Sequence, residues 1–286
     1  MSLSPRSGST PDVGVLIVSW DGYADLWGPL FHFFFRHWSD CPFPVYLGTN
    51  SRTFHDPRVR PVLIGEEVDY CSNLSAMLRQ LPHRWVIPWV EDFIPCARVD
   101  SKRIRTIIDH AAMNGIDYAN LVALPHEVAP MFAGPAVVDT LGEMPADAPY
   151  RASMGVGLWR REALRRLLVP GETAWDLERI GSRRSAELGF RCLCTTVSKS
   201  HDPPVKVVNG IERGRWTQRA ADLLRAEGME NILEARGVET GHGRWSMRFY
   251  SLARYYAVRL LCAVGGVTGR RAIGNIVERR LFARLN

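Results

Sequence analysis

The chain has 286 residues, of which 46% are hydrophobic and 23% are charged, so it can bury a real core and is not a disordered or fibrous protein. Its formal net charge of +6 is unevenly spread. Nine arginines and one acid give residues 240–286 a charge of +8, and the other 27 basic and 29 acidic residues leave 1–239 at −2. This argues against a nucleic-acid-binding core and predicts a tail that meets an anionic surface.

The first residues and the cysteines indicate in which compartment the protein is found. Residues 1–11 are rich in Ser, Pro and Gly without an apolar run, which predicts a loose leader and not a signal peptide. We therefore expect a cytoplasmic protein whose six cysteines stay reduced. No pair of CxxC units occurs in the sequence, so a structural zinc site is not expected.

Strands and helices are predicted to alternate through most of the chain. Residues 13–19 form a continuous apolar, β-branched run, which is typical of a strand buried on both faces. Further strands are predicted at 44–48, 60–64, 85–90, 118–124, 153–158 and 190–197. Helices are predicted at 25–37, 72–80, 99–114, 160–168 and 175–188. Ser72 is the expected N-cap of its helix, and residues 125–150, with five prolines, are interpreted as a long loop or lid.

This alternation predicts an α/β fold with a mostly parallel sheet covered by helices on both faces, in one domain over residues 12–239. Ligands of such sheets lie beyond the carboxyl ends of the strands. That rule nominates Asp21, Asn50, Glu91 and Asp92, each of which follows a predicted strand.

The adjacent acids Glu91 and Asp92 are the strongest single motif, because they directly follow the apolar run at 85–90. Two carboxylates beside a buried strand cost free energy unless a cation or hydroxyl groups meet them. Mg²⁺ or Mn²⁺ bridging a diphosphate is one such partner, since these ions take carboxylate oxygens and leave positions open for phosphate. In the alternative, Asp92 caps the following turn and Glu91 is solvated.

A second group of motifs carries a family resemblance. In chain order the motifs are IVSWDGYADLW at 17–27, WVEDFI at 89–94, GVGLWRREALRRL at 155–167, WDLE at 175–178, GSRR at 181–184, GFR at 189–191 and NGIERGRW at 209–216. Their order and spacing resemble those of inverting glycosyltransferases of the A-type fold, and more narrowly bacterial transferases of capsule and lipopolysaccharide biosynthesis. The resemblance covers about residues 13–217 and implies a Rossmann-like GT-A fold and a nucleotide-sugar donor.

The resemblance also implies roles for five acids. Asp21 would contact the nucleotide, and Asp92 with Glu91 would hold a divalent metal, Mg or Mn, and the donor diphosphate. Asp176 or Glu178 would be the catalytic general base that deprotonates the acceptor hydroxyl. At positions i and i+2 these two acids do not share a helix face, so only one can point into the site, and Asp176 is slightly favoured.

Two departures from the family pattern keep alternatives open. The sequence Glu-Asp-Phe replaces the family's DxD, which leaves metal dependence open, and Asp-Leu-Glu replaces its two-acid motif. Asp176 and Glu178 can also be read as acids that stabilise the start of a helix through its dipole.

Five other residues are weaker candidates. Arg183 and Arg184 could bind the diphosphate or an acidic sugar by bidentate hydrogen bonds, or simply be solvated. Arg213 and Trp216 belong to a glycine-containing turn that could close over phosphate. His201 could supply a metal ligand or be an ordinary loop residue.

Residues 240–286 are expected to form a basic amphipathic helical tail. Between 244 and 264, four arginines fall within an arc of roughly 140° and apolar residues lie opposite. Such a helix suits the interface of an anionic leaflet but is a poor membrane-spanning helix. We therefore expect peripheral attachment at the inner face of the cytoplasmic membrane; the alternative is that the helix packs on the catalytic domain.

The predicted function is transfer of a sugar, with inversion, from a nucleotide-diphosphate donor to a hydroxyl of a lipid-linked surface glycan. The alternative from another class is a catalytically silent membrane-surface scaffold in a polysaccharide assembly complex. Nucleotidyl transfer to a sugar phosphate shares the sheet but needs a Gly-rich loop with Arg or Lys after the first strand, which this sequence lacks.

Overall fold

The computed structural model describes residues 12–123, 133–148, 150–196 and 202–239. The leader at 1–11, His201, part of the predicted lid and the tail at 240–286 lie outside the described residues, so the predictions made for them stay predictions. Within the described residues the central feature is a nine-stranded sheet with the order β3-β2-β1-β4-β9-β6-β10-β8-β7.

The large sheet is mostly parallel. Strands β8 and β9 run antiparallel to their neighbours, and the other seven point the same way. Its strands are β1 (Val13–Val18), β2 (Val45–Thr49), β3 (Val59–Leu63), β4 (Trp85–Val90), β6 (Tyr118–Asn120), β7 (Ala136–Val138), β8 (Leu141–Glu143), β9 (Gly157–Arg160) and β10 (Cys192–Thr195). Two small antiparallel pairs lie outside it: β5 (Phe93–Pro95) with β11 (Val207–Asn209), and β12 (Ile211–Glu212) with β13 (Arg215–Trp216).

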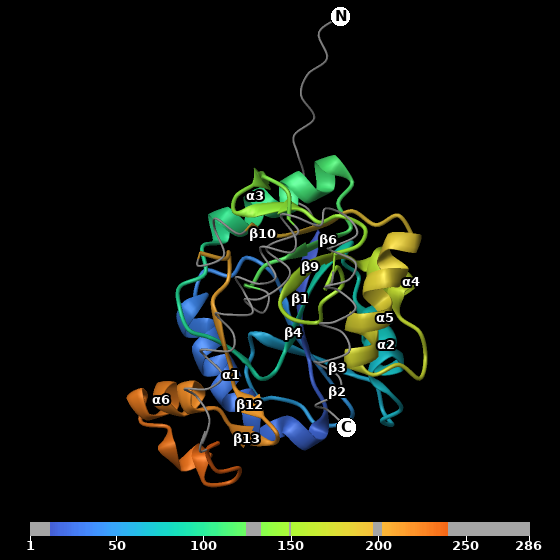
Figure 1. The fold of residues 1–286 in the computed structure, drawn as a ribbon. Helices are drawn as coiled ribbons and strands as arrows, with labels where there is room; N and C mark the ends of the chain where they lie inside the picture. The colour runs from blue at the N-terminus through green and yellow to red at the C-terminus, as the bar shows by residue number, and fades with distance from the viewer. Residues whose placement is uncertain (1–11, 124–132, 149, 197–201, 240–286) are drawn as a thin grey trace, which may run out of the picture.

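Helices cover both faces of the sheet (Figure 1). The helices are α1 (Ala24–His37), α2 (Tyr70–Gln80), α3 (Ser101–Asn114), α4 (Arg161–Leu167), α5 (Ala174–Glu187) and α6 (Gln218–Ala226), with the 3₁₀ turns η1 (Asp21–Tyr23) and η4 (Glu230–Leu233). Val15 and Ile17 of β1 pack in one apolar cluster with α1 and α3, and Leu16 and Val18 pack in a second cluster with α2, α4 and α5. Successive side chains of a strand point to opposite faces, so β1 is buried on both.

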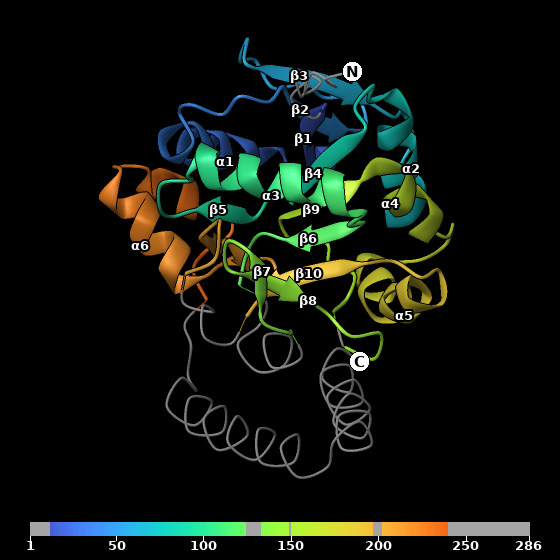
Figure 2. The same ribbon diagram turned by 90° about the horizontal axis from the view of Figure 1, so that it is seen from above.

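A third apolar cluster joins the end of the described chain to α1. Leu224 of α6 and Trp216 pack with Leu26 and Phe33 of α1 and with Ile94 of β5. Helix α6 therefore lies against the outer side of α1, away from the sheet (Figure 2). Of the helices that the structure describes, none has the length and apolar character needed to cross a membrane.

The structure confirms the predicted Rossmann-like α/β fold and corrects several element boundaries. Helix α2 begins two residues before Ser72, and its N-cap is Asp69, whose carboxylate accepts the backbone N–H of Ser72 at 2.8 Å. The strand predicted at 118–124 ends at Asn120, because the side chain of Asn120 accepts the N–H of Val122 at 2.9 Å and turns the chain. Part of the predicted lid is the β7–β8 pair.

Candidate functional site

Asp21 lies just beyond β1 and is held by the loop that follows β2. Its carboxylate accepts the backbone N–H groups of Asn50, Ser51 and Arg52, each at 3.2 Å, and the hydroxyl of Ser51 at 2.6 Å. Partial burial raises the pKa of Asp21, but the hydrogen bonds from Ser51, Arg52 and Asn50 outweigh it and lower the pKa below the ordinary value. Asp21 is therefore ionised and fixes the loop at 50–52 at the carboxyl edge of the sheet.

Glu91 and Asp92 follow β4 at the same edge, as the sequence predicts. Glu91 is 8% exposed and Asp92 is half-buried. Burial, with the charge of the neighbouring Asp92, raises the pKa of Glu91 to about 8. Burial raises the pKa of Asp92 to about 6. Both shifts arise mainly from burial, which disfavours the ionised forms, and a bound cation would favour them.

The turn between β11 and β12 packs directly on Asp92. The backbone N–H of Gly210 donates to the carbonyl oxygen of Asp92 at 2.5 Å, and the N–H of Ile211 donates to its carboxylate and lowers its pKa. A Cβ atom on Gly210 would lie 2.8 Å from the carbonyl oxygen of Asp92. Only glycine allows this approach to Asp92, and the contact with phosphate that the sequence predicts for the turn stays a prediction.

Glu178 projects from α5 toward the sheet. Its Oε1 accepts the hydroxyl of Ser153 at 2.8 Å and the backbone N–H of Met154 at 2.9 Å. Burial raises the pKa of Glu178 above its ordinary value. One carboxylate oxygen is thus anchored by the segment that leads into β9.

Asp176 occupies a different position on the same helix. Its Oδ2 accepts the backbone N–H of Thr173 at 3.2 Å and the Thr173 hydroxyl at 2.7 Å, and its backbone N–H donates to Thr173 Oγ1 at 3.2 Å. This reciprocal arrangement is a capping box. The hydrogen bond from the Thr173 side chain lowers the pKa of Asp176, and the Arg179 guanidinium, 3.2 Å away, adds to the effect.

Two observations indicate that Glu178 and the Glu91–Asp92 pair lie in one region. A Cβ atom on Gly155 would lie 3.2 Å from the ring of Phe93 and 3.5 Å from Ser153 Oγ, so the segment that anchors Glu178 packs against the residue after Asp92. Tyr70, the first residue of α2, is affected by the charges of all three acids. Burial, together with the charges of Glu91, Glu178 and Asp92, raises the pKa of its phenol well above the ordinary value.

Arg236 brings a positive charge to the same region from the end of the described chain. Its guanidinium donates two hydrogen bonds to Asp25 at 2.5 and 2.8 Å and lies 4.7 Å from the ring centroid of Tyr23. The charge of Arg236 lowers the pKa of Glu91, against the larger effect of burial. No motif marks Arg236 in the sequence, because its partner is 211 residues away.

The other predicted site residues lie apart from these acids or are engaged elsewhere. Arg184 donates to the Glu172 carboxylate at 2.5 and 3.1 Å and to a main-chain carbonyl, while Arg183 is exposed on α5. Trp216 is 1% exposed and packs among the side chains beside α6. Arg213 lies exposed in the β12–β13 turn, with a positive φ of 52°.

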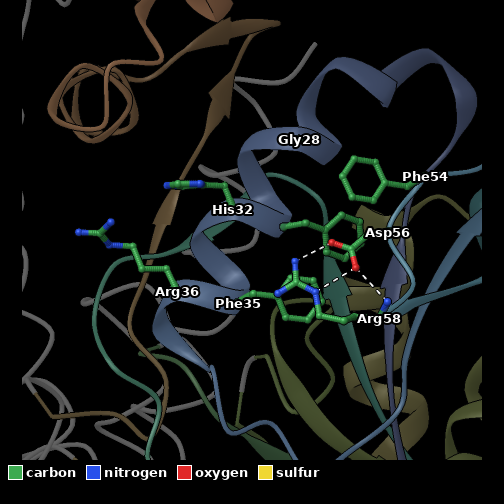
Figure 3. Close-up of a pocket in the computed structure, with 8 residues that line it drawn as sticks. Gly28, His32, Phe35, Arg36, Phe54, Asp56 and Arg58 are labelled. Atoms are coloured by element: carbon green, nitrogen blue, oxygen red, sulfur yellow. Dashed lines mark hydrogen bonds and ion pairs between the residues drawn. The ribbon is translucent and has the colours of Figure 1, made fainter.

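A pocket of about 470 Å³ lies on the outer side of α1, but it contains none of the predicted site residues (Figure 3). It is lined by Gly28, Phe31, His32, Phe35, Arg36, Phe54, Asp56 and Arg58. Arg58 is bonded to Asp56 at 2.6 and 2.9 Å, and its guanidinium carbon lies 3.7 Å from the centroid of the Phe35 ring. The charged groups of this pocket are therefore already paired, and the convergent acids beyond β1 and β4 are the better candidate site.

Comparisons with known proteins give only distant likenesses. No family model and no curated protein sequence matches the chain. The S. aureus TarS fragment 1–349 aligns over 66% of this chain with 10% identity and a TM-score of 0.45, and the chain covers 62% of that fragment, less than two thirds. The Pyrobaculum calidifontis mannosyltransferase PcManGT, solved with GDP-Man and Mn²⁺, aligns over 97% of this chain and 83% of its own, with 15% identity and a TM-score of 0.48.

A cytidylyltransferase from Leptospira borgpetersenii also aligns, over 78% of this chain and 97% of its own, with 11% identity and a TM-score of 0.41. These structures include both a sugar transferase and a nucleotidyl transferase. With every score below 0.5, the likenesses carry no argument about activity, which has to come from the residues of this chain.

Proposed function

We propose that this chain is a glycosyltransferase that moves a sugar from a nucleotide-diphosphate donor to an acceptor hydroxyl, with inversion and with Glu178 as the general base. One observation carries the proposal: the segment that anchors Glu178 packs against Phe93, the residue after Asp92, and the three acids Glu91, Asp92 and Glu178 all have raised pKa values. Clustered acids with raised pKa values are typical of sites that bind cations or transfer protons.

The donor would bind at the carboxyl edge of β1, β2 and β4. Asp21 and the loop at 50–52 that it fixes would contact the nucleotide. Glu91 and Asp92 are suited to a divalent cation, because Mg²⁺ and Mn²⁺ are commonly held by one or two carboxylates together with substrate phosphates. Among the residues that the structure describes, no group of three or more His, Cys, Asp or Glu could hold a metal, so phosphate oxygens and water would complete the coordination.

Glu178 fits the role of base better than Asp176 does. Its Oε1 is anchored by Ser153 and Met154, so Oε2 is the oxygen that would take the proton. As that proton leaves the acceptor hydroxyl, the hydroxyl oxygen bonds to the anomeric carbon, and the bond from this carbon to the diphosphate oxygen breaks. A metal, when bound, would stabilise the charge on the leaving diphosphate. The raised pKa of Glu178 makes it a stronger base near neutral pH than an ordinary glutamate.

The acceptor and the cellular location rest on the sequence alone. The family resemblance supports a lipid-linked glycan of capsule or lipopolysaccharide, and the +8 charge of residues 240–286 supports binding to the inner face of the cytoplasmic membrane. An enzyme docked on that surface would share it with a lipid-linked acceptor.

Thermal unfolding with nucleotides tests the enzyme against the scaffold alternative. UDP, GDP or another nucleoside diphosphate with Mn²⁺ should raise the melting temperature, because a ligand that binds only the folded state stabilises it. GDP-Man and UDP-GlcNAc are suitable first donors, and release of the free nucleoside diphosphate reports turnover. Asp92→Asn is the matched variant and should lose most of the shift. If no nucleotide shifts the wild-type protein and no donor is cleaved, the chain is a scaffold.

A further inference from the structure

Residues 151–154, which we call the strap, run along α5 in the opposite direction to the helix before the chain enters β9. Four hydrogen bonds join the strap to the helix. They link Arg151 to Ser185, Ala152 to Ser182, Ser153 to Glu178 and Met154 to Glu178, at 3.3, 3.1, 2.8 and 2.9 Å. Positions 178, 182 and 185 have the i, i+4, i+7 spacing of one helix face, so the strap covers a single polar stripe of α5.

The two serines of this stripe are oriented to accept hydrogen bonds from the strap. The Ser182 hydroxyl donates to the carbonyl oxygen of Glu178 at 2.5 Å, and the Ser185 hydroxyl donates to that of Ser182 at 2.7 Å. Because a hydroxyl has one hydrogen, each oxygen then serves as the acceptor for Ala152 N–H or for Arg151 Nε. Both serines are buried. The GSRR motif therefore contributes its serine, and not its arginines, to the surroundings of Glu178.

Arg151 fixes the far end of the strap. Its Nη1 donates to the carbonyl oxygens of Met144 and Pro145 at 2.6 and 2.8 Å, and its Nη2 donates to that of Phe190 at 2.5 Å. The side chain is 3% exposed, and none of its described partners is a carboxylate. A buried guanidinium costs free energy that these bonds must offset, and its rigid fork of donors fits several fixed oxygens as a lysine cannot. Arg151 thus joins the strap to the segments that precede it and that lead into β10.

The strap supplies both hydrogen bonds of Glu178 Oε1, from Ser153 and from the backbone of Met154. We propose that Arg151 is a positioning residue for the general base: it holds the strap along α5, and the strap fixes the carboxylate of Glu178 for proton transfer. This inference rests on the proposed function. The described contacts of Arg151 do not include Glu178, so its effect passes through the strap. Burial raises the pKa of Glu178, and the hydrogen bonds from Met154 and Ser153 lower it, so the pKa reports whether the strap is in place.

Titration of Glu178 tests the role of the strap without any need for turnover. In Arg151→Met, Arg151→Lys and Ser182→Ala, a loosened strap should raise the pKa of Glu178 by about one unit, the shift expected when a hydrogen bond to a charged group is lost. Ser153→Ala removes such a bond directly and calibrates the shift. Carbon-13 NMR of the side-chain carboxyl, assigned with Glu178→Gln, measures it in the full chain. Arg151→Lys keeps the positive charge and so separates the hydrogen bonds from a charge effect.

Turnover separates positioning from a purely structural role. In the same variants kcat should fall about 10- to 100-fold, because a displaced catalytic group costs roughly this much. The KM for the donor should stay within about twofold, since the acids proposed to hold the donor are unchanged. Ser101→Ala is the matched control, because it removes a buried hydroxyl that accepts the Trp38 Nε1–H at 2.8 Å on the other face of the sheet. It should lower stability and leave both kcat and the pKa of Glu178 unchanged.

The outcomes distinguish this assignment from the proposed function. If Glu178 titrates as in the wild-type protein in Arg151→Met and Ser182→Ala, the assignment is wrong while the proposed function stands. The same holds if Arg151→Lys keeps the wild-type pKa and kcat. If Arg151→Met does not fold, Arg151→Lys and Ser182→Ala decide the question, since they preserve the charge or remove a single oxygen atom. If the wild-type protein neither binds nucleotide nor cleaves any donor, the proposed function fails and Arg151 has no base to position.

Discussion

At the scale of single residues, two acids on one helix are given different chemistry by their neighbours. Glu178 is half-buried with one anchored oxygen and a raised pKa, whereas Asp176 closes a capping box and has a lowered pKa. The spacing of i and i+2 predicted that only one of them would point into the site, and the sequence slightly favoured Asp176, whereas the contacts in the structure favour Glu178. The choice depends on Ser153 and Thr173, whose contacts with these acids follow from the fold.

Glu178→Gln should therefore abolish transfer. The amide cannot accept the acceptor's proton, so the rate should fall by about 10²- to 10⁴-fold, the usual contribution of a general base. Nucleoside diphosphate affinity, measured by calorimetry, should be nearly unchanged. Asp176→Asn is the control, which should keep its rate and lose no more than about 1 kcal/mol of unfolding free energy through the cap. An active Glu178→Gln beside an inactive Asp176→Asn would reverse the assignment.

Glu91 should make the fold less stable as the pH rises. Its pKa is about 8 in the folded chain against an ordinary value of 4.5, so between these values the folded state holds a proton that the unfolded state has released. The unfolding free energy of the wild-type protein should then fall by about 1.4 kcal/mol per pH unit relative to Glu91→Gln. Urea unfolding at a series of pH values measures this difference. Parallel stability curves for the two proteins would mean that the folded pKa of Glu91 is ordinary.

The positions of the acids at the ends of strands could be predicted from the sequence, but the residues that interact with these acids could not. Asp21, Glu91 and Asp92 follow apolar runs, and the rule for ligands at strand ends places them at one edge. Tyr70 and Arg236 carry no sequence signal, because each acts through residues that are distant in the chain.

At the scale of elements, the alternation of apolar runs and amphipathic stretches predicted the long strands and helices up to residue 197, but not their order in the sheet. It missed helix α6 and the short strands β5, β7, β8, β11, β12 and β13. Strand β9 runs antiparallel between β4 and β6, although it follows both in sequence. Strand β9 begins at Gly157, later than the predicted start at 153, and this also has a local cause. The N–H of Met154 donates to Glu178 and that of Gly155 to Ser153 Oγ at 3.3 Å, so neither is used in the sheet.

The turn between β11 and β12 gives a prediction at this scale. Gly210→Ala would place a Cβ atom 2.8 Å from the main-chain oxygen of Asp92. Because this oxygen cannot move without disturbing β4, the turn should move away from Asp92. We expect the affinity for the nucleotide with Mn²⁺ to fall about tenfold, measured by calorimetry, with a loss of about 1–3 kcal/mol in stability. Gly28→Ala in α1 is the control, because its Cβ would meet nothing within 4 Å and should stabilise the helix. Equal affinities in the two variants would show that the turn has no part in donor binding.

At the scale of the whole molecule, the end of the described chain returns to the site. Residues 207–239 pair with β5, pack on α1 through α6 and place Arg236 beside Asp25 and Glu91. The sequence that follows carries the +8 charge of 240–286, against −2 for the rest. The proposed membrane-binding tail therefore continues directly from the segment that borders the acids.

Because the tail carries most of the positive charge, the proposed location at the membrane can be tested by removing that charge. Changing the four arginines of the predicted amphipathic segment in the tail, Arg244, Arg248, Arg254 and Arg259, to Gln should remove most of the binding to vesicles that contain anionic lipid, because each arginine near such a surface contributes about 1 kcal/mol. Cosedimentation with anionic and with neutral vesicles, at low and high salt, measures the effect, and only the anionic, low-salt binding of the wild-type protein should be strong.

The matched control changes four exposed arginines of the described domain, Arg84, Arg98, Arg105 and Arg219, to Gln, for the same loss of net charge. That variant should bind anionic vesicles as the wild-type protein does, because its tail is unchanged. Cleavage of a soluble donor should survive in both variants, since the acids at the sheet edge are untouched. Equal loss of binding in the two variants would show that net charge, and not the tail, brings the protein to the surface. Unchanged binding in both would show that neither set of arginines brings the protein to the membrane surface.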